Sequence, residues 1–591
     1  MTYNVMAINP GHNGSVALVC DGKLEYYIEE ERLSRSKYDG NPYRGMIYLI
    51  DRYKIDELLM CGTGQEEHRL PWTGEISYAA LVRKYYPDVK VTAVWNEHHY
   101  GHAYAAFFGS GFESAAAVIV DGSGSRQSLQ ISEENRIEAY ETESIFKCEG
   151  TEVQTVFKRH AANDAPTIIR PQEEIDCAIT TVKAYEAVST YLGFGPIEAG
   201  KTMGLAPYGR KCKDIPDLFY RDTKRGDKNL FIPHYPAGSF IDFERFDYLR
   251  QKEDPREWHK DRSKLPDAAK NLAWKVQKET QEYVGDLIEQ AVDMTGEKNI
   301  VISGGYGLNV IANYYYKERF PELNIYVDPI SHDGGTAIGY AKHFSYEYMK
   351  ENEIEIPKDP LTTLYLGPKY EYNERDLERY DGIEVTDATD VDVAQLIKER
   401  NIVSIFQGRA EAGPRALGNR SIVYDPTDPN GKDFVNTVKG REWFRPFAGS
   451  ILQEHAKEWF DLRGCEETPY MMYAMEMEPK HIGEIPAVTH VDGTCRIQTV
   501  TQEQNKNYYN LINEFYKLSG VPLVFNTSFN LGGQPLVETI SDAMETLGYS
   551  DINFMYLPEL GKLVKVDFKL EDRVYKHDFK SEKKNAELKM Y

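Results

Sequence analysis

The amino-acid sequence predicts an α/β protein whose first domain contains two copies of one strand unit. Residues 5–31 are expected to form strand, loop, strand, tight turn and strand, with Asp21-Gly22 as the two-residue turn. Residues 115–140 repeat this order, with an apolar strand at 115–120, a glycine and serine loop, a strand at 128–131 and a turn at 134–135. The two units indicate a duplicated α/β domain with a cleft between its halves. Two unrelated hairpins are the alternative.

A long helix and a buried strand extend the same pattern. Apolar residues from Ala268 to Met294 recur at helical spacing, and Gly296 follows as a helix-ending residue. Residues 299–302 then form an apolar strand that leads into Gly304-Gly305. Strands that alternate with helices in this way are typical of α/β domains.

Composition limits the functions open to the chain. Its 591 residues, 41% of them hydrophobic, suffice for about two to four domains with buried cores. The net charge of −24 argues against a protein that coats nucleic acid or an anionic membrane, although it permits a local basic pocket. The sequence shows no apolar run of about 18 residues, no signal peptide and no CxxC pair among its seven cysteines. We therefore expect a cytoplasmic protein with reduced thiols and no membrane partner.

A polar segment at 351–360 divides the chain. It combines five charged residues with two prolines, and we interpret it as an interdomain linker. We predict a first domain at 1–355, a second at 356–560 and a solvated, charged tail at 561–591.

Two histidines have the spacing of metal ligands. His98 and His102 follow an apolar strand and lie four residues apart at the start of an expected helix, so they share one helix face. Asp121 and Asp333, each after an apolar strand, are the candidates for further ligands. Mixed imidazole and carboxylate ligands suit iron, manganese or zinc. The alternative is a polar helix start whose histidines cap the helix or face solvent.

Two glycine-rich stretches could approach a phosphate or a ribose. Gly304 and Gly305, with Asn309 beyond them, follow a buried strand and precede a helix, where backbone N–H groups can bind such oxygens. Residues 200–204 resemble the end of a phosphate loop but lack its upstream glycine, so we do not assign a Walker A motif. Taken alone, each of these stretches is more often a tight turn than a ligand-binding site.

Cationic residues concentrate between residues 407 and 447. Arginines and a lysine lie there among glycines, prolines and aromatic residues, which is unlike a solvated helix face. Guanidinium groups bind phosphate with two hydrogen bonds, so this density favours an anion site. Arg496 and the polar stretch 526–530 lie downstream and could complete it. Structural ion pairing with the surplus carboxylates is the alternative.

Together, several strings resemble the NodU/CmcH family of O-carbamoyltransferases, which includes the enzyme that carbamoylates tobramycin. They lie in the family's order over nearly the whole chain, at 9–13, 29–32, 98–103, 120–122, 200–209, 303–305, 413–421, 441–447, 489–500 and 526–530. The resemblance implies a TsaD-like first domain of the actin, sugar-kinase and Hsp70 type (ASKHA) and a YrdC-like second domain. It also implies two reactions. Carbamoyl phosphate and ATP form carbamoyl adenylate and pyrophosphate in the second domain, and an acceptor hydroxyl then takes the carbamoyl group in the first, with release of AMP.

The resemblance assigns roles to residues that match the family's motifs. The implied ligands of carbamoyl phosphate and ATP are Arg415, Lys439, Arg445, Arg496 and Ser528. The implied metal ligands, usually for iron, are His98, His102, Asp121 and Asp333. Gly304, Gly305 and Asn309 would bind the nucleoside, His12 would act as the general base, and Lys37 would help at the acceptor pocket. The implied cofactor is Fe²⁺ or another divalent metal, with Mg²⁺ accompanying ATP.

The acceptor stays open at this point. Residues 148–178 and the tyrosine-rich stretch 313–316 match no family motif. Family acceptors are sugars, antibiotics and related alcohols; a hydroxymethyl pyrimidine, as a nucleotide or within DNA, is the alternative. A basic stretch at 250–264 could contact a DNA backbone or could be a solvated loop.

Other functions need different evidence. A tRNA-modifying threonylcarbamoyl enzyme would need a basic face, against which the net charge argues. A non-catalytic nucleotide-binding scaffold would have lost the metal ligands and the arginines, all of which are present. A homodimer is left open.

Overall fold

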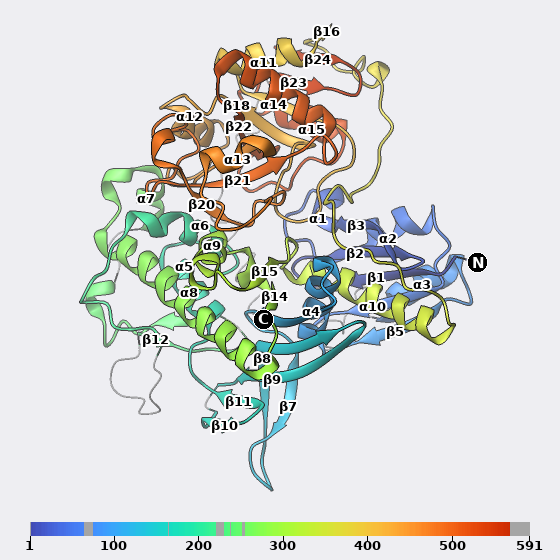
Figure 1. Ribbon diagram of the computed structural model, residues 1–591, viewed down its shortest axis with the longest axis vertical. Helices are drawn as coiled ribbons and strands as arrows, with labels where there is room; N and C mark the ends of the chain where they lie inside the picture. Colours follow the sequence, from blue (N-terminus) through green and yellow to red (C-terminus); the bar gives the residue numbers. More distant parts are fainter. Residues whose placement is uncertain are drawn as a thin grey trace. The chain divides into compact units, whose positions relative to one another are not determined.

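The computed structural model describes residues 2–63, 75–163, 165–219, 230–236, 238–250 and 254–567. The chain divides into two compact units, one built from most of residues 1–362 and the other mainly from residues 363–567 of the described part (Figure 1). The short segments Arg35–Lys37 and His259–Ser263 group with the second unit. Within the described residues, no helix has the length and apolar character needed to cross a membrane.

The first unit begins with a five-stranded sheet in the order β3-β2-β1-β4-β5. Its strands are β1 (Asn4–Asn9), β2 (Ser15–Cys20), β3 (Lys23–Glu29), β4 (Glu57–Cys61) and β5 (Lys90–Val94). β1 is antiparallel to β2 and parallel to β4, β2 is antiparallel to β3, and β4 is parallel to β5. The apolar runs of β1 and β4 are wholly buried, as expected for strands covered on both faces.

The second sheet of this unit contains the same pattern. Its order is β10-β11-β9-β8-β6-β14-β15, with β7 paired to β8 at the side. The strands are β6 (Ser114–Val120), β7 (Arg126–Gln130), β8 (Arg136–Glu149), β9 (Glu152–Ala161), β10 (Ile168–Arg170), β11 (Glu173–Asp176), β14 (Asn299–Ser303) and β15 (Asn324–Val327). The run β9-β8-β6-β14-β15 has two antiparallel pairings followed by two parallel ones, the same directions as in β3-β2-β1-β4-β5. The predicted duplication is therefore confirmed, and it gives the first unit an ASKHA-like α/β fold.

The second copy of the repeat differs from the first in one detail. The predicted strand at 128–131 is found as β7, but β6 pairs with β8, and β7 is a side strand on β8. The side chains of β7 alternate in exposure, as in a strand with one solvent-exposed face. β8 is long enough to pair with β6, β7 and β9. Residues 148–178, which matched no motif, supply the end of β8 together with β9, β10 and β11.

Helices cover and connect these sheets (Figure 1). Up to residue 351 they are α1 (Glu30–Ser34), α2 (Tyr43–Ile50), α3 (Glu75–Tyr85), α4 (His98–Ser110), α5 (Thr181–Tyr191), α6 (Ala199–Leu205), α7 (Pro255–Lys260), α8 (Asp267–Thr295), α9 (Val310–Arg319) and α10 (Thr336–Glu351). The predicted long helix is α8, which Gly296 ends in the left-handed conformation. A two-stranded ribbon, β12 (Phe231–Ile232) with β13 (Phe240–Ile241), completes the described part of this region. Residues 200–204 lie on α6 rather than on a loop after a strand, in keeping with the absence of a Walker A motif.

Close packing of α4 against α10 requires two glycines. A Cβ atom on Gly339 would lie 2.1 Å from the carbonyl oxygen of Gly101, and one on Gly101 would lie 2.8 Å from the Cβ atom of Thr336. The Tyr340 hydroxyl also donates to the Glu97 carbonyl over 2.5 Å, just before α4 begins. This contact sets the start of α4, with its histidines, beside the start of α10.

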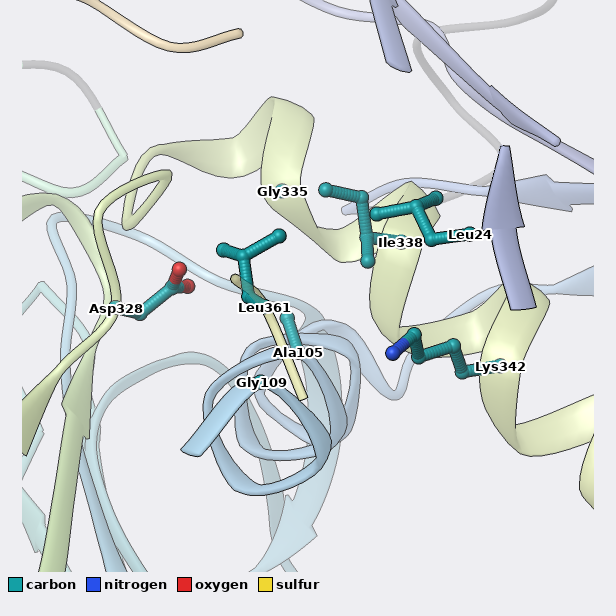
Figure 2. Close-up of a pocket in the computed structure, with 8 residues that line it drawn as sticks. All are labelled: Leu24, Ala105, Gly109, Asp328, Gly335, Ile338, Lys342 and Leu361. Carbon is teal, nitrogen blue, oxygen red and sulfur yellow. The ribbon is translucent and has the colours of Figure 1, made fainter. Parts of the chain in front are cut away.

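The predicted linker is fixed to the first unit near its end. The Asp359 carboxylate accepts hydrogen bonds from Lys342 Nζ at 2.8 Å and from the Leu24 amide at 3.0 Å. The Leu361 amide donates to the Gly109 carbonyl at 2.9 Å. Leu361 thereby closes one side of a small pocket between α4 and α10, shown in Figure 2.

Asp359→Asn is expected to lower the free energy of unfolding by about 3 kcal/mol, because the Lys342 ammonium, only 2% exposed, stays buried without its carboxylate. Urea denaturation followed by circular dichroism measures this loss. Adding Lys342→Met removes the buried charge and is expected to restore most of the stability. A double variant no more stable than Asp359→Asn would contradict the assignment.

The second unit is built on a nine-stranded sheet in the order β16-β24-β23-β17-β18-β22-β19-β21-β20. The strands are β16 (Ile383–Asp387), β17 (Val403–Phe406), β18 (Arg420–Tyr424), β19 (Ala448–Leu452), β20 (Ala474–Glu476), β21 (Thr494–Val500), β22 (Leu523–Ser528), β23 (Phe554–Leu557) and β24 (Lys562–Val566). The helices are α11 (Asp390–Lys398), α12 (Gly431–Val438), α13 (Gln453–Trp459), α14 (Lys506–Ser519) and α15 (Ile540–Gly548).

The start of the predicted tail is part of this sheet. β24 pairs with β16 and β23, and its Val564 and Val566 side chains are buried. Apolar residues at 563, 564 and 566 form this strand, although lysines at 562 and 565 give it the composition of a tail. The rest of the predicted tail, 568–591, lies outside the described residues.

Candidate functional site

The first unit brings the four predicted metal ligands together. His98 and His102 lie on the first turn and a half of α4, Asp121 follows β6, and Asp333 precedes α10. His98 Nε2 lies 3.1 Å from His102 Nε2, 3.6 Å from Asp121 Oδ2 and 3.7 Å from Asp333 Oδ1. One ligand atom from each residue lies within 4.8 Å of all the others, and no other group of this kind occurs among the described residues. The histidine spacing, the end of β6 and the turn before α10 thus converge on one point.

The cluster carries an excess of negative charge. Burial alone would lower the pKa of His98, but Asp333 and Asp121 outweigh burial and raise that pKa to about 10. Burial and the nearby charge of His98 lower the pKa of His102 to about 3. Two carboxylates therefore face one imidazolium and one neutral imidazole. Such a buried set attracts a cation, and its two nitrogen and two oxygen donors suit iron, manganese or zinc.

His12 borders this cluster from the loop between β1 and β2. Its Nδ1 atom lies 3.6 Å from Asp333 Oδ2, while the other oxygen of Asp333 faces His98. The His12 side chain is 44% exposed, so its ring is open to a substrate. The loop is held in place because the Gly11 and Gly14 amides donate to the carbonyls of residues 40 and 39, at 3.1 and 3.0 Å.

The glycine turn after β14 adjoins the same cluster. The Gly305 amide donates to Asp121 Oδ1 at 3.3 Å. Gly304 has a φ of 85°, and a Cβ atom there would lie 2.4 Å from the Val120 carbonyl oxygen. Asn309 is engaged with the protein: its side-chain oxygen accepts from the Ala312 amide, and its amide group exchanges two hydrogen bonds with Gln277. Asn309 therefore caps α9, and its contact with a nucleoside stays a prediction.

Two further charged residues near the cluster escaped sequence reasoning. On α5, Lys183 Nζ donates to Glu186 and to the Pro236 carbonyl, both at 2.8 Å. Burial raises the pKa of Glu186, Lys183 opposes that rise, and the charges of Asp121 and His12 also act on it. Their spacing in sequence is that of an ordinary helix ion pair, so no sequence signal separates them from a surface pair. Lys37, predicted for the acceptor pocket, is exposed and belongs to the segment that groups with the second unit.

The second unit gathers the predicted cations. Lys439 Nζ contacts the Ser528 carbonyl and lies 3.5 Å from Ser528 Oγ and 3.1 Å from Asn530 Oδ1. Burial together with Arg496 and Arg445 lowers the pKa of Arg415 well below its usual range. Burial likewise lowers the pKa of Arg496 to about 10, and Arg445 adds to that effect.

Arg441 also belongs to this group, although the resemblance did not assign it a ligand role. Burial and the charge of Arg445 lower its pKa, and its guanidinium lies 4.9 Å from the centre of the Phe447 ring. Among the described residues, the one ion pair within this set of cations is Arg445 with Glu442, at 3.5 Å. Structural ion pairing therefore does not explain the cluster, and a bound anion would balance it.

Comparison with known proteins decides the family. Residues 49–342 match the family described as Carbamoyltransferase N-terminus, and residues 394–562 match Carbamoyltransferase C-terminus. Nodulation protein NolNO of Sinorhizobium fredii is 30% identical, over 92% of this chain and 77% of its own length. The chain belongs to the NodU/CmcH-type carbamoyltransferase family. It is accordingly an enzyme that transfers a carbamoyl group.

Two further matches cover less of the chain. Nodulation protein U of Rhizobium tropici is 34% identical to this carbamoyltransferase over 44% of the chain and 43% of its own length. A crystal structure titled as full-length HypF in the phosphate- and nucleotide-bound form covers 60% of the chain and 56% of its own, at 12% identity and a TM-score of 0.34.

Two predicted site residues of this carbamoyltransferase lie outside the segments that match the family. His12 and Lys37 precede the matched N-terminal segment, so their assignment depends on the loop motif and on position. In the basic stretch at 250–264, Arg250 pairs with Asp247 and Lys264 with Glu257, while Lys252 lies outside the described residues. These pairs weaken the case for a DNA-binding surface there.

Proposed function

We propose that this carbamoyltransferase is an ATP-dependent O-carbamoyltransferase that uses carbamoyl phosphate and modifies a small-molecule alcohol. The observation that carries the proposal is the cation cluster of the second unit, in which Lys439 is buried and the arginines are partly buried, and which contains a single ion-paired member among the described residues. Partly buried guanidinium groups and a buried ammonium group, in excess of carboxylates, favour a highly charged anion, and carbamoyl phosphate and ATP together supply that charge. A YrdC-like identity for this unit is part of the proposal.

The first reaction forms carbamoyl adenylate. Water releases orthophosphate from carbamoyl phosphate, and an oxygen of the resulting carbamate attacks the α-phosphorus of ATP, from which pyrophosphate leaves. Arg415, Lys439 and Arg496 stabilise the phosphate charge in a site whose positive groups are already in place. The Ser528 hydroxyl, beside Lys439, adds a hydrogen bond to the substrate, Arg445 completes the set, and Mg²⁺ accompanies ATP.

The second reaction transfers the carbamoyl group in the first unit. His12 accepts the proton of the acceptor hydroxyl at Nε2, since Nδ1 faces Asp333, whose carboxylate stabilises the imidazolium that forms. The hydroxyl oxygen then bonds to the carbamoyl carbon as the bond from that carbon to the AMP phosphate oxygen breaks. The set His98, His102, Asp121 and Asp333 would hold Fe²⁺ or a similar ion, which when bound supplies Lewis acidity toward a phosphate oxygen. The turn at Gly304 and Gly305, whose Gly305 amide donates to Asp121, would let the nucleotide approach its backbone closely.

Mass spectrometry of reactions with ATP and carbamoyl phosphate tests the proposal. The acceptor pool contains sugars, other alcohols, hydroxymethyl nucleotides and hydroxymethylated DNA. We expect pyrophosphate and AMP together with one carbamoyl group added to an alcohol. Carbamoylation of a hydroxymethyl pyrimidine instead would overturn the acceptor class, and threonine-dependent cleavage of ATP would favour a tRNA-modifying enzyme. Absence of both pyrophosphate and a carbamoylated product, with the metal bound, would leave a nucleotide-binding scaffold.

A further inference from the structure

Two polar residues lie side by side behind the metal-ligand cluster, at the carboxyl ends of neighbouring parallel strands. Ser303 is the last residue of β14, and Asp328 directly follows β15. The register pairs Ile302 with Val327, and the Asp328 amide donates to the Ile302 carbonyl at 3.0 Å. Both side chains are therefore fixed by the sheet.

A chain of hydrogen bonds joins these residues to His102. The Ser303 hydroxyl donates to Asp328 Oδ2 at 2.9 Å, and Ser303 Oγ lies 3.3 Å from His102 Nδ1. The second carboxylate oxygen, Oδ1, accepts from the Ile330 amide at 3.0 Å. His102 and Ser303 are fully buried, and Asp328 is 3% exposed, so water does not compete for these bonds.

The direction of the chain fixes the tautomer of His102. An ionised carboxylate only accepts hydrogen bonds, and a serine hydroxyl has one proton to donate. Because Ser303 gives that proton to Asp328, its oxygen is left to accept from His102, whose Nδ1 must then carry the ring proton. The lone pair of Nε2 is thereby directed at His98 Nε2, 3.1 Å away, and at the metal-ligand cluster.

A buried carboxylate is costly unless hydrogen bonds or nearby charges compensate it, which makes the placement of Asp328 informative. Burial raises the pKa of Asp328, and the hydrogen bonds from the Ile330 amide and Ser303, together with the charge of His332, oppose that rise. Figure 2 shows Asp328 and Lys342 on opposite sides of the small pocket, and Lys342 pairs with Asp359 instead. The turn made with the Ile330 amide uses only one carboxylate oxygen, and an asparagine would serve that turn equally well.

We propose that Asp328 and Ser303 are positioning residues that hold His102 as a neutral ligand with its Nε2 lone pair directed at the metal site. This inference rests on the proposed metal site, and it adds a specific role for two residues outside the ligand set. A ligating imidazole whose second nitrogen is bound in this way binds metal more tightly, by about 10- to 100-fold.

Asp328→Asn provides the test. The asparagine keeps the turn, but its side-chain amide donates to Ser303, which then donates to His102 Nδ1 and leaves the ring proton on Nε2. We expect Co²⁺, used as a visible-absorbing probe and measured by competition with a chelator, to bind this variant about 10- to 100-fold more weakly than the wild type. Asp359→Asn is the matched control, since it removes the other carboxylate beside the same pocket and is expected to lose stability but keep Co²⁺ affinity.

The outcomes separate the two proposals. Wild-type Co²⁺ affinity in folded Asp328→Asn would overturn the positioning role while leaving the metal site intact. If Asp328→Asn does not fold, Ser303→Ala decides, with weaker Co²⁺ binding again expected and unchanged binding again overturning the role. A wild-type protein that binds no Co²⁺, or binds it no better than His102→Ala, would overturn the metal site and this inference with it.

Discussion

His12→Ala is expected to slow carbamoyl transfer about 10²- to 10⁴-fold while leaving pyrophosphate release from ATP and carbamoyl phosphate unchanged. The reason is position: His12 lies on the loop between β1 and β2, beside Asp333 and the metal-ligand cluster of the first unit, whereas the cation cluster lies in the second. Pyrophosphate and carbamoylated product are measured in the same reactions, so the ratio of the two isolates the transfer step.

A second histidine variant tests whether the loss of any imidazole side chain has the same effect. His455, a partly exposed histidine on α13, pairs with Glu458 and has no assigned role, so His455→Ala is expected to leave both products unchanged. Equal losses of pyrophosphate and carbamoylated product in His12→Ala would contradict a division of the two reactions between the units. The transfer rate with His12→Gln, which keeps a hydrogen-bonding side chain but no base, is expected to be as low as with alanine.

The ligand cluster could be predicted because short-range rules place each member. Helical spacing sets His98 and His102 on one face, and an aspartate directly after an apolar strand lies at the carboxyl edge of a sheet, where Asp121 is found. The duplicated strand order could be predicted from the sequence for the same reason, because buried strands appear there as runs of apolar residues. The sequence could not show that β8 rather than β7 pairs with β6, because pairing depends on contacts between segments far apart in the chain.

Other features were hidden because their sequence signals are common. Lys183 and Glu186 have the spacing of any surface ion pair, and only the position of α5 sets them near Asp121. Asp359 belongs to a segment with the composition of a linker, yet its carboxylate binds the buried Lys342. β24 was assigned to a tail because lysines interrupt its apolar residues. In each case the deciding partner lies on another element of the fold.

Arg415→Met is expected to reduce pyrophosphate release at least 10²-fold and, in the same protein, to raise the stability of the ligand-free form. The lost guanidinium is a charged donor to phosphate in a site arranged in advance, which accounts for the rate. The stability gain, about 0.5–2 kcal/mol, follows because burial and the charges of Arg496 and Arg445 all disfavour a positive charge at residue 415, as its lowered pKa shows. Methionine has a similar length and no charge, so it fills the space without the repulsion.

Thermal unfolding without ligands and the rate of pyrophosphate release, measured on one preparation, decide between two accounts of this cluster. Arg463→Met is the control, because Arg463 pairs with Glu476 and Asp461, and its loss is expected to leave pyrophosphate release unchanged without adding stability. A ligand-free Arg415→Met that unfolds at a lower temperature than the wild type would mean that the protein itself balances this charge. The cluster would then be structural, and the anion site would have to be sought elsewhere in the second unit. A variant that is more stable yet inactive would mean that Arg415, Arg445 and Arg496 repel one another in the ligand-free protein. A bound phosphate substrate would then relieve this repulsion.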